Sequence, residues 1–215
     1  MLMEQERELI VKYGKKLISS GLTKGTGGNL SIYNKKEGLI AISPSGMDYF
    51  ETTPLDITIM DLKGNLVEGE RKPSVEYEMH LIFYKNRKNV FSVVHTHSIA
   101  SSTIAALRWS LPAVNYLVGL SGENLVPCAD YASFGSKELA ENALKGMGNG
   151  YAVFLANHGL LTTSTDIHKA FYIAEEIEHC AEIFLRAKAV GNPVIISDEE
   201  MVKMNILFKS YGQNK

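Results

Sequence analysis

The stretch Val90-Phe91-Ser92-Val93-Val94-His95-Thr96-His97 carries more information about the fold than any other part of the sequence. Its apolar run predicts a buried strand over 90–97, and side chains two residues apart on a strand point to the same face. The imidazoles of His95 and His97 then start about 6.6 Å apart along the strand and can converge on one metal ion at about 2.0–2.1 Å each. The alternative is a pair of ordinary polar residues at a strand end.

The composition around this stretch is that of one globular domain. The 215 residues fit a single hydrophobic core, and 45% hydrophobic with 21% charged residues excludes a disordered or fibrous chain. A net charge of -2 gives no basic field, so we expect no nucleic-acid partner. The absence of a signal-peptide pattern and of a long apolar run predicts no membrane association. Two cysteines form no disulfide framework, so we expect a soluble cytoplasmic protein.

The spacing of apolar residues predicts an α/β fold, with a sheet covered by helices. Helices are expected over 5–19, 75–86, 136–147 and 166–190, after Ser98 and after 197–200. Strands are expected over 30–34, 39–43, 57–61, 66–68, 90–97 and 151–156. His168 and His179 lie on the long helix over 166–190, where we expect ordinary helix residues.

Two further residues are candidates to complete a metal site with the histidine pair. His158 follows the strand over 151–156, and Gly159 would let the backbone turn sharply there. The alternative for His158 is a solvated turn residue. Pro73 and Ser74 place Glu76 in the first turn of a helix, where the helix dipole favours a carboxylate. The alternative for Glu76 is a helix-capping role.

His80 lies four residues after Glu76 and therefore shares its helix face. It is either a further ligand or a packed partner. Three imidazoles with one carboxylate suit zinc, and cobalt, manganese or iron are also compatible. A carboxylate that can swing away from the ion is typical of a catalytic site, because the substrate needs an open position.

Small-residue turns provide a candidate anion site. Gly27-Gly28-Asn29 and Ser45-Gly46 allow backbone N–H groups to approach an anion, and Ser74 adds a hydroxyl just before a helix. Each of these turns alone is an ordinary one. Together they are compatible with a phosphate site that is not a P-loop, since the Walker spacing is missing.

Taken in order, these motifs resemble the class II (zinc-dependent) sugar-phosphate aldolases, and within them the L-fuculose-1-phosphate aldolases most closely. The resemblance covers nearly the whole chain. The motifs that carry it are GTGGNLS (25–31), SPSG (43–46), KPSVE (72–76), PAVNY (112–116), VPCADYASFG (126–135), VHTH (94–97), NHGL (157–160) and FKSYG (208–212).

The resemblance implies a single class II aldolase/epimerase-like domain over 1–215, with a three-layer α/β/α arrangement around a mostly antiparallel central sheet. It implies a homotetramer with active sites between neighbouring subunits and a small-molecule sugar phosphate as substrate. One Zn²⁺ per subunit would be bound by His95, His97 and His158, with Glu76 completing the resting ligand set.

The same resemblance assigns the substrate contacts. Tyr116 would reach into the adjacent subunit's site. The phosphate would be held by Gly28, Asn29, Ser45, Gly46, Ser74 and Val75. The aldehyde portion of the substrate would be enclosed by Phe134, Phe208 and Tyr211. Val75 stands where the family pattern usually has a second serine, so it would contribute only its backbone N–H. This departure leaves the identity of the substrate open.

The implied reaction is reversible cleavage of L-fuculose 1-phosphate into dihydroxyacetone phosphate and L-lactaldehyde. Glu76 would transfer the proton at the reacting carbon, and Tyr116 would handle the proton of the C4 oxygen. Three alternatives share the scaffold: an L-ribulose-5-phosphate 4-epimerase, a methylthioribulose-1-phosphate dehydratase and a non-enzymatic adducin-head module. The epimerase has an aspartate where this chain has Glu76, and an interaction module need not keep a metal-ligand set.

Overall fold

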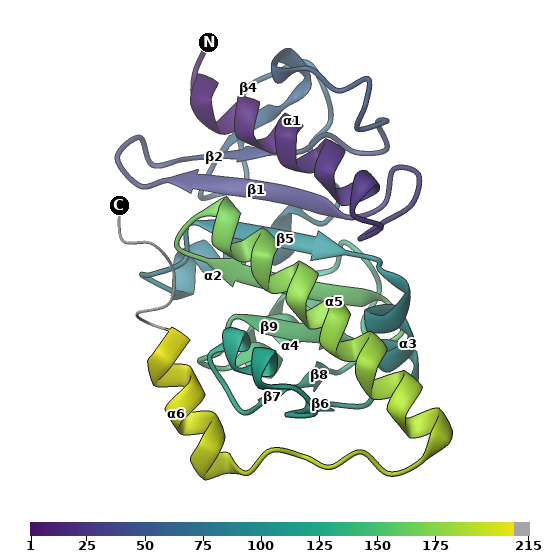
Figure 1. The fold of residues 1–215 in the computed structure, drawn as a ribbon. Helices are drawn as coiled ribbons and strands as arrows, with labels where there is room; N and C mark the ends of the chain where they lie inside the picture. Colours follow the sequence, from purple (N-terminus) through teal and green to yellow (C-terminus); the bar gives the residue numbers. More distant parts are fainter. Residues whose placement is uncertain (209–215) are drawn as a thin grey trace.

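An eight-stranded, mostly antiparallel sheet forms the centre of the computed structural model, which describes residues 1–208 (Figure 1). The strand order is β4-β3-β2-β1-β5-β10-β9-β8, and only the β8–β9 pair is parallel within these residues. The remaining two strands, β6 and β7, pair separately. The strands are β1 (Asn29–Asn34), β2 (Leu39–Ile42), β3 (Thr58–Asp61), β4 (Leu66–Glu68), β5 (Ser92–Thr96), β6 (Leu111–Pro112), β7 (Leu125–Val126), β8 (Cys128–Ala129), β9 (Ala152–Leu155) and β10 (Gly159–Ser164).

Helices flank this sheet, with α1 and α5 in front of it and α2 and α4 behind it in Figure 1. One hydrophobic cluster contains residues of α1, α3 and α5, and a second contains residues of α2 and α4. The expected α/β fold with a helix-covered sheet is therefore confirmed. None of the helices formed by residues 1–208 is both long enough and apolar enough to cross a membrane. The helices are α1 (Glu4–Ser19), α2 (Tyr77–Asn86), α3 (Ile99–Leu107), α4 (Lys137–Met147), α5 (Ile167–Val190) and α6 (Asp198–Phe208), with short 3-10 helices η1 (Pro54–Asp56) and η2 (Tyr116–Ser121).

The apolar run that precedes the histidine pair is buried from both sides. β5 pairs antiparallel with β1 on one edge and β10 on the other. Val94 belongs to the cluster under α1 and α5, whereas Val93 belongs to the cluster under α2 and α4. Because both faces are covered, both alternating sets of side chains are apolar, and the sequence shows a continuous run. The buried strand is confirmed, although it ends at Thr96, so His97 lies one residue beyond it.

The sequence patterns predict no strand between 156 and the helix that starts near 166, and this is wrong. β10 occupies Gly159–Ser164 and lies in the middle of the sheet, between β5 and β9. All six of its residues are buried, so no alternation of polar and apolar side chains marks the strand. The two-residue strand β8 was missed for a simpler reason, because two residues carry no periodicity.

The start of α3 is capped by a side chain from another helix. Ser98 occupies the N-cap position, yet its hydroxyl donates a 2.6 Å hydrogen bond to Glu178 of α5 and does not cap the helix itself. The Glu178 carboxylate also accepts from the backbone N–H groups of Ala100 and Ser101, both at 2.8 Å. A carboxylate satisfies the N–H groups at a helix start and interacts favourably with the helix dipole. Glu178 thereby fixes the helix that follows His97 directly.

Replacing Glu178 by alanine should lower the free energy of unfolding by roughly 1.5–3 kcal/mol, since charge-assisted hydrogen bonds to the start of α3 are lost. Urea denaturation followed by circular dichroism measures the change. Glu182→Ala is the matched control on the same helix. Glu182 is exposed, and within residues 1–208 its ion pair is with Arg186 one turn away, so the change should stay within about 0.5 kcal/mol. Equal losses in the two variants would contradict the capping role.

Candidate metal centre and substrate site

Four side chains from three separate segments converge at the end of β5. Glu76 comes from the residue before α2, His95 from β5, His97 from the residue after it, and His158 from the turn between β9 and β10. One potential ligand atom from each lies within 4.8 Å of the other three. In Figure 1 the arrowhead of β5 marks this end of the strand. The structure thus brings together the four residues that the sequence analysis proposed as ligands.

The distances between these atoms fit a single ion. The Nε2 atom of His95 lies 2.8 Å from that of His97 and 3.2 Å from that of His158. Glu76 places Oε2 at 3.4 Å from His95 Nε2 and Oε1 at 3.4 Å from His158 Nε2. Ligand atoms about 2.0–2.1 Å from a tetrahedral ion are themselves about 3.3 Å apart. The four printed distances are close to this value, and the remaining pairs of ligand atoms stay within 4.8 Å of one another.

The protonation states of the imidazoles suit metal binding. His95 Nδ1 donates a 2.9 Å hydrogen bond to the carbonyl of Leu160, which leaves the lone pair of Nε2 directed at the cluster. Burial lowers the pKa of His95 well below its usual value, and neighbouring His158 and His97 lower it further. Burial likewise lowers the pKa of His97 to about 4. The pKa of His158 is lowered chiefly by burial, with Glu76 acting in the opposite direction. Near neutral pH all three are neutral and can coordinate a cation.

One oxygen of the cluster lacks a partner. Glu76 is buried, and its Oε1 atom has no hydrogen-bond partner among residues 1–208. An unsatisfied buried carboxylate oxygen is costly unless a cation or donor compensates it. Three neutral imidazoles and this oxygen are the donor set of zinc and of similar divalent metals. The residues present therefore fit a divalent metal ion.

Glycines allow the backbone to approach the histidines closely. Gly28 has φ +71°, and a Cβ atom there would lie 2.6 Å from the carbonyl oxygen of His95. A Cβ on Gly27 would lie 2.8 Å from Nδ1 of His97. The carbonyl of Thr96 would collide with a Cβ on Gly159. The residues between α1 and β1 can pack against the ligands only because these side chains are absent.

The turn that carries His158 differs from the sequence expectation. Asn157, not Gly159, adopts the left-handed conformation, with φ 55°. Its backbone N–H donates to the carbonyl of Ala105, and its side-chain oxygen accepts from Arg108. Asparagine tolerates this conformation better than other residues with a side chain. Gly159 serves close approach and not the sharp turn that was expected of it.

Glu76 also lies two helix positions earlier than expected, because the helix predicted over 75–86 starts at residue 77. α2 begins at Tyr77, so Glu76 occupies the N-cap position and not the first turn, and its side chain makes no capping hydrogen bond. Its Oε2 atom instead accepts a 2.8 Å hydrogen bond from the side-chain amide of Asn29. His80 stays outside the ligand cluster, and its ring contacts Asn29 and Ser31. Of the two roles left open for His80, the structure has the packed partner.

The turns proposed for phosphate lie next to one another. Pro44 and Pro73 form an isolated β-bridge, flanked by backbone hydrogen bonds from Ser45 to Lys72 and from Ser74 to Ser43, both 3.0 Å. Ser45 and Gly46 line a cavity of about 450 Å³ that Arg71 and Lys72 also line. No role was predicted for these two cations, although Lys72 opens the KPSVE motif and Arg71 directly precedes it. Arg71 is already paired with Asp56 at 2.8 Å, whereas Lys72 is exposed.

Two of the aromatic residues assigned to the aldehyde and to the adjacent subunit, Phe208 and Tyr116, lie together outside the ligand cluster. Tyr116 is 49% exposed and stacks on Phe208, with ring centroids 6.1 Å apart. Both line a cavity of about 310 Å³ between η2, α5 and α6, and no residue of the ligand cluster lines it. Phe134 is 72% exposed, and the adjacent Gly135 packs against the backbone of Val75. Tyr211 lies outside the described residues.

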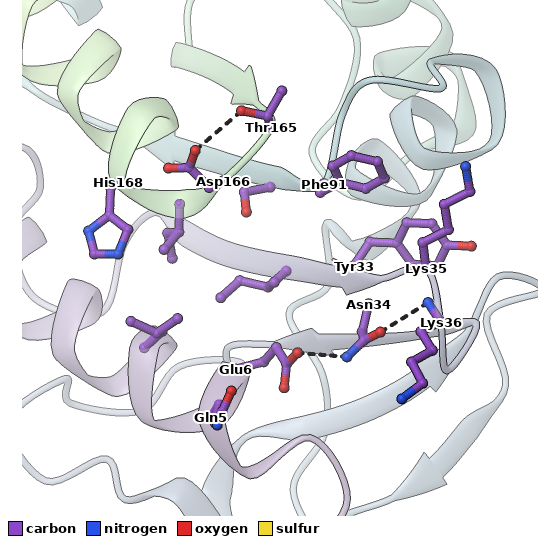
Figure 2. A pocket seen from close by; sticks show the side chains of 14 residues that line it. Gln5, Glu6, Tyr33, Asn34, Lys35, Lys36, Phe91, Thr165, Asp166 and His168 are labelled. Carbon is purple, nitrogen blue, oxygen red and sulfur yellow. Dashed lines mark hydrogen bonds between the residues drawn. The ribbon is translucent and has the colours of Figure 1, made fainter. Parts of the chain in front are cut away.

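Another cavity, of about 420 Å³, lies at the opposite end of β5 from the histidines (Figure 2). Within it Asn34 donates to Glu6 at 2.8 Å, and Thr165 donates to Asp166 at 3.2 Å. His168, expected to be an ordinary helix residue, points into this region. These polar groups satisfy one another and do not converge on a common point, so the ligand cluster remains the better candidate for chemistry.

Comparison with known proteins gives a consistent result. The family model described as Class II Aldolase and Adducin N-terminal domain matches residues 8–185. The chain is 54% identical to the 5-deoxy-D-ribulose 1-phosphate aldolase of Bacillus thuringiensis serovar kurstaki, over 99% of this chain and 100% of that protein. It is 36% identical to the L-fuculose phosphate aldolase of Escherichia coli K12, over 89% and 88% of the two chains. Among solved structures, an L-fuculose 1-phosphate aldolase superposes with a TM-score of 0.95 at 46% identity, over 97% of this chain and 98% of that one.

Substituting Gly28 by alanine should reduce metal affinity at least ~10-fold, because the new Cβ collides with the carbonyl of His95 and displaces this ligand. Gly38→Ala is the matched control: Gly38 has φ +69°, nearly the same as Gly28, but has open space around it. Both variants should lose roughly 1–2 kcal/mol of stability from the left-handed backbone. Zinc content after dialysis against a weak chelator, measured by mass spectrometry, separates them. Full zinc content in Gly28→Ala would contradict the packing argument.

Proposed function

The chain belongs to the class II aldolase and adducin N-terminal domain family, and from this premise we propose that it is a divalent-metal-dependent aldolase which cleaves a ketose 1-phosphate into dihydroxyacetone phosphate and a short aldehyde. The observation that carries the proposal is the Glu76–His95–His97–His158 cluster, in which Glu76 and His95 are buried and one carboxylate oxygen has no hydrogen-bond partner among residues 1–208. We propose zinc as the metal, one ion per subunit, because three imidazoles and a carboxylate are a typical zinc donor set.

Two substrates are candidates, and they differ in the aldehyde released. Cleavage of the C3–C4 bond of 5-deoxy-D-ribulose 1-phosphate leaves acetaldehyde, whereas L-fuculose 1-phosphate leaves L-lactaldehyde. The sequence analysis favours L-fuculose 1-phosphate. The relative named for 5-deoxy-D-ribulose 1-phosphate is 54% identical over its full length, whereas the Escherichia coli L-fuculose phosphate aldolase is 36% identical. The higher identity supports 5-deoxy-D-ribulose 1-phosphate as the better substrate. A small difference in the aldehyde pocket is enough to shift such a preference.

The bound metal would supply the positive charge that stabilises the negative charge developing at the carbonyl end of the substrate. Glu76 is suited to move the proton at C3, because its Oε1 is buried, unpartnered and adjacent to the ligand cluster. Its Oε2 stays held by the Asn29 amide. Confining the carboxylate in this way orients it for proton transfer at one carbon.

The phosphate would bind where the turns of Ser45 and Ser74 meet. Hydroxyl, backbone and amide groups are available as donors: the hydroxyls of Ser45 and Ser74, the backbone N–H groups of Gly46 and Val75, and the remaining N–H of the Asn29 amide. Gly28 provides the close backbone approach. Lys72 lines the adjoining cavity and adds positive charge that favours an anion. The Ser45 and Ser74 backbone N–H groups are already used within the fold, so they do not take part.

We further propose a homotetramer in which a neighbouring subunit completes each site. The observation behind it is that Tyr116 and Phe208 line a cavity that no residue of their own chain's ligand cluster lines, and that Tyr116 and Phe134 are exposed. Tyr116 of a neighbour would then handle the proton of the C4 oxygen. Phe134, Phe208 and Tyr211 would enclose the aldehyde portion of the substrate.

The proposal is tested by the release of dihydroxyacetone phosphate from both ketose 1-phosphates, measured with a coupled reductase. We expect turnover of both, with the higher kcat/KM for 5-deoxy-D-ribulose 1-phosphate. A chelator should abolish release, and zinc should restore it, because the ligand cluster holds the metal. Zinc-loaded protein that releases no dihydroxyacetone phosphate from either substrate would refute the aldolase and point to the dehydratase or epimerase instead.

Glu76→Gln should slow the exchange of the C3 proton of dihydroxyacetone phosphate with solvent by about 10²–10⁴-fold, since the amide cannot act as a base. Proton nuclear magnetic resonance in deuterium oxide measures this exchange, normalised to the metal content of each sample. Glu78→Gln is the control, because Glu78 lies two residues further on in α2 and outside the cluster. An exchange rate like that of the unmodified protein would remove Glu76 from its assigned role.

A further inference from the structure

A line of buried polar side chains leads away from Glu76 between β1 and α2. Asn29 donates to Glu76 Oε2 at 2.8 Å, and Nε2 of His80 lies 2.5 Å from Oδ1 of Asn29. Nδ1 of His80 lies 2.6 Å from the Ser31 hydroxyl, which in turn lies 2.6 Å from the hydroxyl of Tyr84. All five side chains are buried, and His80 is 0% exposed. The sequence analysis assigned no function to this line.

Two sequence periodicities bring these groups together. Asn29 and Ser31 are two residues apart on β1 and therefore point to the same side of the sheet. Glu76, His80 and Tyr84 are spaced four residues apart along α2 and its N-cap, so they lie along one helix face. The two side chains from β1 fit between the three from α2 and its N-cap, so strand and helix side chains alternate along the line.

The direction of every hydrogen bond in the line is determined by chemistry. An ionised carboxylate only accepts, so the Asn29 amide must turn its NH₂ group toward Glu76 and its oxygen toward His80. The Nε2 atom of His80 must then carry the proton and donate it to this oxygen. Its Nδ1 atom is left to accept from the Ser31 hydroxyl, and the Ser31 oxygen accepts from Tyr84.

This arrangement needs a neutral imidazole, which the surroundings provide. Burial lowers the pKa of His80 to about 3, so a single donor and a single acceptor nitrogen persist over the whole neutral range. A neutral imidazole with its two nitrogens in these roles matches the two partners without an unsatisfied atom.

We propose that His80 is a positioning residue that acts on Glu76 through Asn29. His80 holds the oxygen of the Asn29 amide, and this keeps the amide N–H group on Glu76. The Glu76 carboxylate is thereby held in one orientation in the cluster. If the Nε2 donor were lost, the Asn29 amide could rotate and present its oxygen to the carboxylate, and two acceptors would then repel each other. Glu76 would lose its fixed partner and occupy several orientations. This role rests on the proposed function of Glu76, but it is measurable without turnover.

Two substitutions of His80 separate its two nitrogens. In His80→Gln the amide nitrogen can occupy the place of Nε2, so the bond to Asn29 is kept. In His80→Asn the shorter side chain reaches only the place of Nδ1, so the contact with Ser31 is kept and the bond to Asn29 is lost. Tyr84→Phe removes the far end of the line and leaves the bonds of His80 to Asn29 and Ser31 in place.

The main readout is the visible absorption spectrum and the affinity of Co²⁺ bound to each purified protein, because Co²⁺ absorption reports ligand geometry. We expect His80→Asn to alter the spectrum and weaken Co²⁺ binding by about 10–100-fold, the range for losing a group that orients a ligand. His80→Gln and Tyr84→Phe should keep the unmodified spectrum and bind Co²⁺ within about 3-fold. In the aldolase assay, His80→Asn should lower kcat, and KM should rise as well, because the Asn29 amide is also a proposed phosphate donor; His80→Gln should keep both values.

Thermal unfolding of all three variants distinguishes positioning from packing. A spectrum of His80→Asn that matches the unmodified protein would overturn the proposal. A second result would also overturn it: equal spectral changes in His80→Asn and His80→Gln together with equal losses of melting temperature. That result would assign His80 a packing role only. If the unmodified protein cleaves neither ketose phosphate, the aldolase proposal fails, while the Co²⁺ spectra still decide the role of His80.

Discussion

Antiparallel pairing of β5 with both β1 and β10 is the constraint on which the rest of the structure depends. His95 lies opposite Asn29 of β1 and opposite Leu161 of β10, so the backbone fixes this ligand from both sides. The same pairing brings the turn before β10 close to the end of β5, which carries His158 to the other imidazoles. Gly28 and Gly159 permit the close approach, because a side chain at either position would collide with the β5 backbone.

Further elements then orient the ligands by hydrogen bonds to groups that are themselves buried. The carbonyl of Leu160 holds His95 by its Nδ1, and the Asn29 amide holds Glu76 by one carboxylate oxygen. Glu178 anchors the helix that begins two residues after His97. A site built in this way on strands and helix ends changes little in geometry when a loop moves, which suits both a metal centre and proton transfer at one atom.

The proposed substrate side of the site has a different character. Its hydroxyls and cations lie on turns, and Tyr116 and Phe134 are exposed on the single chain. Relatives of this chain share its scaffold while their names differ in the sugar phosphate, which is expected when chemistry resides in the sheet and selectivity in loops. Val75, exposed beside Glu76 and packed near Gly135, lies on this proposed substrate side.

The sequence by itself determined the features that depend on neighbouring residues. It predicted the buried strand before His95, the shared direction of His95 and His97 and the long helix α5, because strand alternation and helical periodicity are local properties of the chain. That Glu76 and His158 join the histidine pair followed from the resemblance of the motifs to class II aldolases, and the structure shows the four side chains together. Only the tertiary structure decided that β10 is a central strand, that Asn157 and not Gly159 makes the turn, and that the Asn29 amide serves Glu76. These features arise from backbone pairing and side-chain contacts between segments tens of residues apart. Such contacts leave no period in the sequence, since each is set by where a distant partner lies.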